Sequence, residues 1–194
     1  MVPELAQLFA SAAACARCPG MGCRPVLSAA NGPTGSRVLF VGEAPGRLGA
    51  GRTGVPFSGD MAGRRFEALL AAAGLNREEV FVTNAVLCLP LDAQGRNRPP
   101  AAREIGSCGP WLSETLRVLS PRLVVGMGST ALRALRAVAP HALVVGSAGS
   151  EPQVWNGMRL AAVYHPAARS QVHRPWASQV SDWQRLGAWI RMNL

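Results

Sequence analysis

Two cysteines of this chain have the spacing of a metal site, which makes the cysteines the first candidates for chemistry. Cys15 and Cys18 are separated by two residues, and Cys88 and Cys108 follow far along the chain. Four thiolates can hold either a zinc ion or a four-iron cluster, and the spacing does not choose between them. The alternative, buried free cysteines, is less favoured beside so close a pair. We expect a site of these four residues, with Cys23 outside it.

Two polar side chains at the ends of apolar runs are candidates for ligand contacts. The amide of Asn84 offers both a donor and an acceptor, as reading the edge of a pyrimidine requires. His165 could donate a hydrogen bond to a leaving group that gains negative charge. Each also fits a structural role on its own: a turn or cap for Asn84, and a surface or structural position for His165.

A glycine-rich loop, residues 42–60, follows the apolar run Val38–Val41. Its glycines let the backbone approach a ligand closely. It is not a Walker loop, because no Gly-Lys-Ser/Thr follows, and Pro45 breaks the spacing of a dinucleotide fingerprint. Glu43 and Asp60 are the carboxylates that could position water. Asp60 suits the N-cap of the following helix equally well.

The elements that must position these residues alternate between strands and helices. Strands are predicted at Arg37–Val41, Val80–Val86, Leu123–Val125 and Arg159–Tyr164, and helices at about 2–14, 61–73, 100–119, 129–139 and 176–192. Alternation of this kind predicts an α/β fold, a three-layer α/β/α sandwich with a central four-stranded parallel sheet. The loops 42–60, 83–88 and 165–170 then meet at one edge of the sheet, where open α/β sheets bind ligands.

The segment between the third and fourth predicted strands carries two weaker signals. Leu143–Val145 is a candidate short edge strand. Asn156-Gly157 favours a tight hairpin turn. We see no internal repeat and no linker, so we expect a single domain over residues 1–194.

Composition narrows the partner and the compartment. The net charge is +9, and all twenty basic residues are arginine. Such a charge favours a nucleic-acid partner, although an arginine-biased composition would produce it too.

The composition also excludes some chemistry. Without lysine, lyase chemistry through a lysine Schiff base is excluded. An odd number of cysteines argues against a disulfide framework. The start of the chain does not read as a signal peptide, and no apolar run approaches the ~20 residues of a membrane helix. We expect a cytoplasmic monomer without membrane contact.

The motifs together resemble the uracil-DNA glycosylase superfamily. Gly42-Glu43-Ala44-Pro45-Gly46 and Pro56-Phe57-x-Gly59 are similar to motif A of its iron–sulfur family four. The inner part of the loop, residues 49–60, is closer to family five. Thr83-Asn84 is similar to family four, and His165-Pro166 to motif B of the superfamily. The resemblance extends from Cys15 to the last helix.

The resemblance implies a monofunctional DNA glycosylase that hydrolyses the bond between a damaged base and its sugar in base excision repair. It implies a [4Fe–4S] cluster on the four cysteines named above. It also implies that His165 donates to the departing uracil, that Phe57 stacks on the flipped base, that Asn84 reads its edge, and that Gly42, Ala44 and Pro45 surround it. Water would be positioned by Asp60 or Glu43. Basic residues beside the loops are expected to hold DNA phosphates: Arg96, Arg98, Arg169 and Arg174.

One position departs from family four and widens the expected range of substrates. Ala50 stands where family four usually carries an acidic residue that excludes the thymine methyl, so we expect a roomier pocket that also takes other deaminated bases.

Two other functions are compatible with parts of this sequence. One is a damage-binding module that keeps the pocket without turnover, and the other is an iron–sulfur redox sensor. The sensor would need neither Asn84 nor His165.

Overall fold

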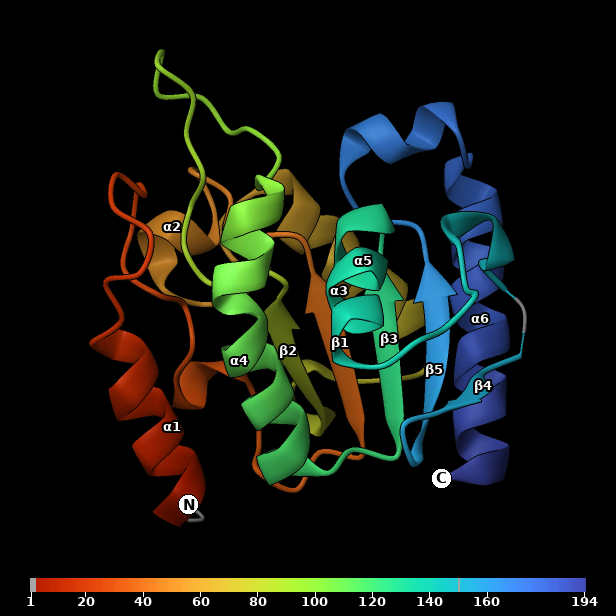
Figure 1. Cartoon of the computed structure of the whole chain (residues 1–194). Helices are drawn as coiled ribbons and strands as arrows, with labels where there is room; N and C mark the ends of the chain where they lie inside the picture. Colours follow the sequence, from red (N-terminus) through yellow and green to blue (C-terminus); the bar gives the residue numbers. More distant parts are fainter. Residues whose placement is uncertain (1–2, 150) are drawn as a thin grey trace.

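Four strands lie parallel in one sheet, and a fifth, short strand pairs antiparallel at its edge (Figure 1). The computed structural model describes residues 3–149 and 151–194. The strand order is β2-β1-β3-β5-β4, with bounds β1 Val38–Gly42, β2 Val80–Asn84, β3 Leu123–Met127, β4 Gln153–Trp155 and β5 Met158–Val163. The predicted α/β/α sandwich is confirmed, but the sheet has five strands and not four.

Helices cover both faces of the sheet because the central strands are apolar on both sides (Figure 1). Leu39 and Val41 of β1 pack with one set of helices, and Val38 and Phe40 pack with the other. The first set comprises α1 Pro3–Ala13, α4 Ala102–Leu119 and α5 Ser129–Val138, and the second comprises α3 Met61–Ala72 and α6 Trp176–Asn193. Each such buried aliphatic or aromatic side chain contributes about 1.5–3 kcal/mol to folding.

Shorter helical segments lie in the loops: α2 Ala50–Thr53, η1 Ala29–Asn31, η2 Arg77–Glu79, η3 Val145–Ser147 and η4 Ala168–Val172. None of the helices in the described residues is long and apolar enough to cross a membrane.

The edge strand predicted at 143–145 is wrong. Val145 begins a short 3-10 helix, and the edge strand is formed instead by Gln153–Trp155. Asn156 and Gly157, with φ of 47° and 74°, form the tight turn that folds this strand back onto β5. The apolar run at 143–145 is too short for a strand because polar and glycine residues follow it. The Asn156-Gly157 pair, by contrast, favours the tight turn of a hairpin.

The other edge of the sheet, along β2, is covered by side chains from nearby loops. Asn31 donates its amide N–H to the carbonyl oxygen of Val82 at 2.7 Å, and Arg77 donates to the carbonyl oxygen of Val80 at 3.3 Å. Gly32 crosses directly over this edge, and a Cβ there would lie 2.8 Å from the Cα of Phe81. The chain therefore satisfies backbone groups of an edge strand without adding another strand.

Candidate active site

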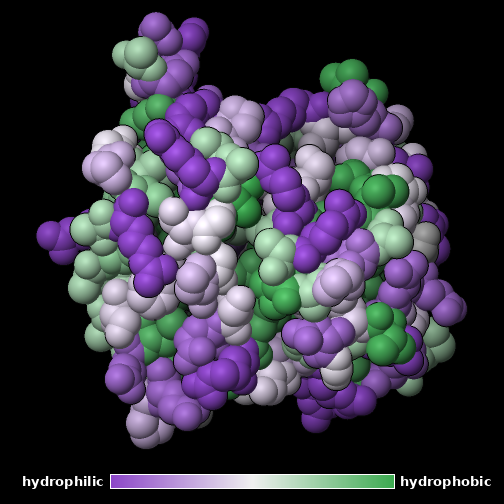
Figure 2. Space-filling model, viewed as in Figure 1, coloured by the Kyte–Doolittle hydropathy of each residue, from purple (hydrophilic) through white to green (hydrophobic). Residues whose placement is uncertain are grey.

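A cavity of about 270 Å³ lies at the carboxyl end of the sheet, between the loops that follow β1, β2 and β5. Parallel strands place the ends of these loops together, as expected for an open α/β sheet. The predicted site residues that line it are Glu43, Ala44, Pro45, Phe57, Asp60, Asn84, Arg98, His165 and Arg169. Gly42, Arg96 and Arg174 are not among its lining residues. Hydrophilic residues gather along this end of the molecule, over the projecting 90–98 loop and the centre of the upper edge (Figure 2).

Gly42 brings two of the predicted base-contacting side chains together. A Cβ at this position would lie 2.5 Å from Oδ1 of Asn84 and 2.8 Å from Cε2 of Phe57. Both distances are far inside van der Waals contact, so only glycine fits without moving one of the two side chains. Gly42 and Asn84 are also paired residues at the ends of the neighbouring strands β1 and β2.

The side chain of Asn84 is buried, with 3% exposure for the residue, and borders the cavity. No side-chain hydrogen bond joins its amide to another of the described residues, and neither amide atom is among the buried side-chain atoms that lack a partner, so the amide is open to the cavity. The amide of Asn84 is therefore free to pair with a ligand in the cavity.

Phe57 forms an aromatic wall of the cavity. Its ring lies 4.7 Å from the ring of Phe66 in the core and 5.5 Å from the ring of His165, measured between centroids. The backbone of Phe57 has φ of 52°, which is uncommon for a residue other than glycine. Gly63 of α3 packs directly on the carbonyl of Phe57 and leaves room for this conformation. The ring is thus fixed between the core and the cavity.

Asp60 is both a helix cap and a cavity residue. Its Oδ1 accepts a hydrogen bond from the backbone N–H of Gly63 at 2.9 Å, which caps α3 as the sequence predicts. Its Oδ2 lies against the glycine loop, where a Cβ at Gly46 would come within 2.9 Å of it. The cap holds one carboxylate oxygen in place, and the other faces the loop that borders the cavity.

Glu43 is held by two residues distant in sequence. Its Oε2 accepts a hydrogen bond from the hydroxyl of Thr130 at 2.8 Å, and its Oε1 pairs with Arg169 at 3.0 Å. Thr130 lies in the first turn of α5, whereas Arg169 lies in the loop after β5. Sequence reasoning missed Thr130, because a threonine near a helix start carries no signal of a partner 87 residues away.

His165 has a defined hydrogen-bonding state. Its Nδ1 accepts from the backbone N–H of Ala167 at 3.1 Å, so the neutral ring carries its proton on Nε2 and can donate from there. Removal of the ring from water lowers the pKa of His165 to about 4. The charge of Arg169 also lowers this pKa, and the carboxylates of Glu43 and Asp60 oppose the shift. Near neutral pH the ring is uncharged.

The comparisons with known proteins agree with this geometry. Residues 29–187 match the family model described as the uracil DNA glycosylase superfamily. A type-4 uracil-DNA glycosylase from Archaeoglobus fulgidus is 31% identical over 159 residues, which cover 78% of this chain and 76% of that protein. This chain belongs to the uracil DNA glycosylase superfamily. The resemblance predicted from the motifs is therefore confirmed.

Relatives of both predicted kinds are found within the superfamily. A type-4 uracil-DNA glycosylase from Thermotoga maritima is 36% identical over 118 residues, 61% of this chain and 58% of the relative. A type-5 uracil-DNA glycosylase from Pyrobaculum aerophilum is 33% identical over 156 residues, 70% of this chain and 63% of the relative. The matches thus span less than two thirds of these two relatives.

The hydrogen bond to Thr130 gives a first prediction for this superfamily member. Thr130→Val should slow base release about tenfold, equivalent to ~1.4 kcal/mol in the barrier, because Glu43 loses the donor that orients it. Thr130→Ser keeps the hydroxyl and should retain most of the wild-type rate. Single-turnover release from uracil-containing DNA measures both variants. Equal rates for valine and serine would show that the hydroxyl does not matter.

The lowered pKa of His165 gives a second prediction. In the unfolded chain a histidine binds a proton below its ordinary pKa of 6.5, whereas the folded chain does so only below about 4. Between these values the unfolded state binds more protons, so the free energy of unfolding falls as the pH drops from 6.5 to 4. The loss should be at most about 3–4 kcal/mol. Urea unfolding at several pH values should show a smaller loss in His165→Ala, and an unchanged loss would contradict the assignment.

All four arginines predicted to hold DNA phosphates are paired with carboxylates in this structure. Arg169 pairs with Glu43, as described above, and is the most accessible of those near the cavity, with a 66% exposed side chain. The other three pairs are Arg96 with Asp92 at 2.9 Å, Arg98 with Glu104 at 2.6 Å and Arg174 with Asp182 at 2.6 Å. Arg47 was not among the arginines predicted from the sequence to hold DNA phosphates, but it borders an adjoining cavity together with Arg96.

The four predicted cluster cysteines come together around one small cavity: Cys15, Cys18, Cys88 and Cys108. Burial raises the pKa of Cys88 to about 12 and that of Cys108 to about 11. Cys23 is not among the lining residues, and its sulfur accepts from the backbone N–H of Leu89 at 3.2 Å. Among the described residues no group of three or more His, Cys, Asp or Glu is arranged to hold a single metal ion.

The surroundings of this cysteine cavity suit a sulfur-rich group. Trp111 lines the cavity, and its buried indole N–H has no acceptor in the described part of the chain. The backbone N–H of Leu87 already donates to the sulfur of Cys108 at 3.3 Å. Such N–H donors commonly surround the sulfurs of iron–sulfur clusters. The donor set and the unpaired indole therefore fit an iron–sulfur cluster.

Proposed function

We propose that this chain is a monofunctional DNA glycosylase that removes uracil from DNA by hydrolysis of the N-glycosidic bond. The observation that carries this proposal is the cavity in which the unpaired amide of Asn84, the ring of Phe57 and the N–H donor of His165 converge. A base cannot reach such a cavity from within a duplex, so the nucleotide must first be extruded.

The residues divide the work of binding the extruded base. Phe57 stacks on the base, a contact worth ~1–3 kcal/mol in other nucleic-acid complexes. The amide of Asn84 pairs with the donor and acceptor of the uracil edge. Both groups are already in place, since Phe57 is wedged against Phe66 and Asn84 closes the end of β2. Little ordering is needed when the base enters, which favours tight binding.

His165 stabilises the departing base. As the bond between C1′ and the base nitrogen breaks, the bonding electron pair moves onto the uracil ring and its oxygens. The Nε2–H of the neutral His165 donates a hydrogen bond to this developing charge. A preorganised donor of this kind is commonly worth ~3–4 kcal/mol in the transition state.

Water completes the reaction. A water molecule positioned by the carboxylate of Asp60 or Glu43 attacks C1′, its oxygen forms the new bond, and one of its protons passes to the carboxylate or to solvent. The uracil anion takes up a proton after it leaves. The product is an abasic site. Strand cleavage through a lysine Schiff base is excluded because the chain contains no lysine.

The cavity favours a range of bases wider than uracil. Ala50 is buried and lines the cavity, so a small methyl group stands where a longer side chain could restrict the base. We propose that other deaminated bases are also released. Hypoxanthine and xanthine are the first to test, since both are larger than uracil.

We also propose that Cys15, Cys18, Cys88 and Cys108 hold a [4Fe–4S] cluster. The proposal is supported by the shared cavity, the unpaired indole of Trp111 and the relatives named type-4 uracil-DNA glycosylase. The cluster would join the segment after α1 to the segment after β2 and to α4. Its contribution would be a structural cross-link between these segments.

Base release from labelled oligonucleotides tests the function. Duplex and single strands that contain uracil, hypoxanthine, xanthine or thymine are incubated with the protein, and alkali then reveals abasic sites. Release of uracil over many turnovers is expected, with slower release of the larger bases. Tight binding of uracil-containing DNA without release of any base would contradict the proposed glycosylase activity and indicate a damage-binding module instead. Release of uracil alone would show that Ala50 does not widen the range.

A further inference from the structure

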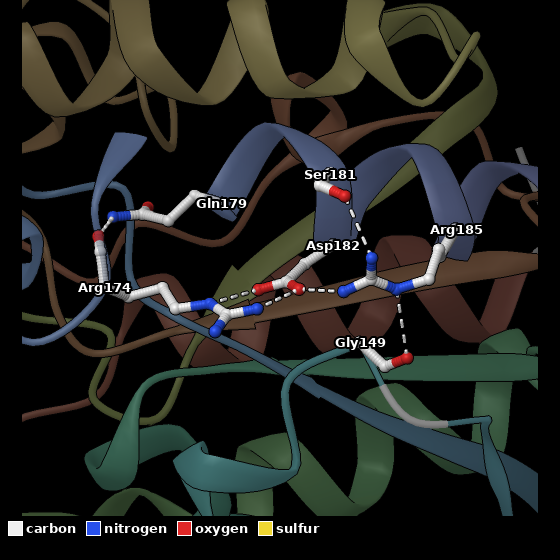
Figure 3. Close-up of polar contacts among 6 residues, drawn as sticks. All are labelled: Gly149, Arg174, Gln179, Ser181, Asp182 and Arg185. Carbon is white, nitrogen blue, oxygen red and sulfur yellow. Dashed lines mark hydrogen bonds and ion pairs between the residues drawn. The ribbon is translucent and has the colours of Figure 1, made fainter. Parts of the chain in front are cut away.

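A buried carboxylate outside the cavity joins the end of the 165–175 loop to helix α6. Asp182 lies in the second turn of α6, and its side chain is 2% exposed. It accepts two hydrogen bonds from Arg174, from Nε at 3.0 Å and from Nη2 at 2.6 Å, and it also pairs with Arg185 (Figure 3). Two guanidinium groups thus converge on one carboxylate, as a buried charge requires.

The same cluster reaches two further segments. Gln179 donates to the carbonyl oxygen of Arg174 at 2.7 Å, so Arg174 is held by its backbone as well as by its side chain. On the other side, Arg185 donates to the hydroxyl of Ser181 at 2.9 Å and contacts the carbonyl of Gly149 (Figure 3). Gly149 packs directly over the ion pair, with Oδ1 of Asp182 within 2.6 Å of where its Cβ would stand.

This geometry speaks against a phosphate contact for Arg174. A bidentate pair with a buried carboxylate engages two of its nitrogens, and Arg174 would have to give up both hydrogen bonds and leave Asp182 with Arg185 alone to reach DNA. Arg169 in the same loop differs, because its side chain is 66% exposed and its partner Glu43 borders the cavity.

We propose that Asp182 is a positioning residue for base release, and that it acts by fixing Arg174 at the end of the 165–175 loop. The inference rests on the proposed function. The loop begins at His165 and ends at Arg174. Between them lies Arg169, which contacts Glu43. With both ends fixed, by β5 and by Asp182, the donor of His165 and the guanidinium of Arg169 keep their places at the cavity.

Three variants separate loop positioning from general stability. Asp182→Asn and Arg174→Gln break the link to the loop. Arg185→Gln removes the other guanidinium of the same carboxylate and leaves that link intact, so it is the matched control. Single-turnover release of uracil is measured at saturating enzyme, well below the melting temperature of each variant. Circular dichroism confirms that each has folded.

Misplacement of catalytic groups by about 1 Å can cost up to ~10²-fold in rate, so Asp182→Asn and Arg174→Gln are each expected to slow release at least ~10-fold. The double variant, Asp182→Asn with Arg174→Gln, should be no slower than the slower of the two single variants, because both changes break the same link. Arg185→Gln should lower the melting temperature and change the rate by less than about twofold. Equal slowing in Arg185→Gln would overturn the inference, since general destabilisation would then explain all three.

The salt dependence of DNA binding tests the role of Arg174 directly. Affinity for a duplex with a stable tetrahydrofuran abasic analogue is measured between 50 and 200 mM salt, where each lost phosphate contact lowers the log–log slope by about one. Arg174→Gln should keep the wild-type slope. A slope lower by about one with an unchanged release rate would make Arg174 a phosphate contact and overturn the inference. Failure of the wild type to release uracil would instead reject the proposed function, and the slope would still decide the role of Arg174.

Discussion

Replacing His165 by alanine should slow the release of uracil by about 10²–10³-fold, which is the largest effect expected from one cavity residue. The alanine variant loses the Nε2–H that we propose donates to the departing base, whereas the ring of Phe57 and the amide of Asn84 remain at the cavity. Binding of uracil-containing DNA should change little, because the lost interaction is strongest in the transition state. Single-turnover kinetics, with affinity measured separately, distinguish the two effects.

Two variants serve as controls for this prediction. His173→Ala removes an exposed histidine from the same loop and should leave the rate near that of the wild type. His165→Gln retains an N–H donor and should recover part of the loss. A full rate in His165→Ala would show that the departing uracil is stabilised by another group. In that case the neutral state of the ring would have no catalytic importance.

Replacing Cys88 by serine should remove the proposed [4Fe–4S] cluster and destabilise the fold. The purified wild type is expected to be brown, with absorbance near about 400 nm, and the variant should be colourless. A group bound at 1,000 times its dissociation constant contributes about 4 kcal/mol, and for a chain of this size its loss lowers the melting temperature by about 8–16 °C. Absorbance, iron content and thermal unfolding measure these effects.

The fifth cysteine provides the matched control. Cys23→Ser changes a thiol that lies outside the cavity of the other four, so colour and iron content should persist. Loss of iron in both variants would make Cys23 a ligand, and zinc in place of iron in the wild type would reject the cluster. Iron retained in Cys88→Ser would remove Cys88 from the ligand set.

The fold could be predicted well because its signals are local. Apolar runs such as Val38–Val41 are buried on both faces, which is typical of central strands in a parallel sheet. The edge strand predicted at 143–145 was the exception. Leu143 is buried although it lies in no strand, so its apolar character reflects core packing and not strand pairing. Single-residue hydrophobicity does not distinguish these two causes.

The sequence predicted those candidate site residues that lie in a recognisable motif. It did not predict those that reach the site only through the three-dimensional fold. Glu43, Asn84 and His165 line one cavity, as expected from strands that end at the same edge. The contact of Thr130 with Glu43 joins residues 87 positions apart and leaves no local pattern. The arginines show the same limit, because their charge is visible in the sequence and their carboxylate partners are not.

The edges of the sheet affect how the protein behaves at high concentration. Exposed edge strands offer unpaired backbone groups to other molecules, and aggregates grow by adding strands there. In this chain Asn31 and Arg77 occupy backbone carbonyls along β2, and the opposite side ends in a hairpin strand of three residues. Fibril-like growth from the native state is therefore disfavoured at both ends of the sheet.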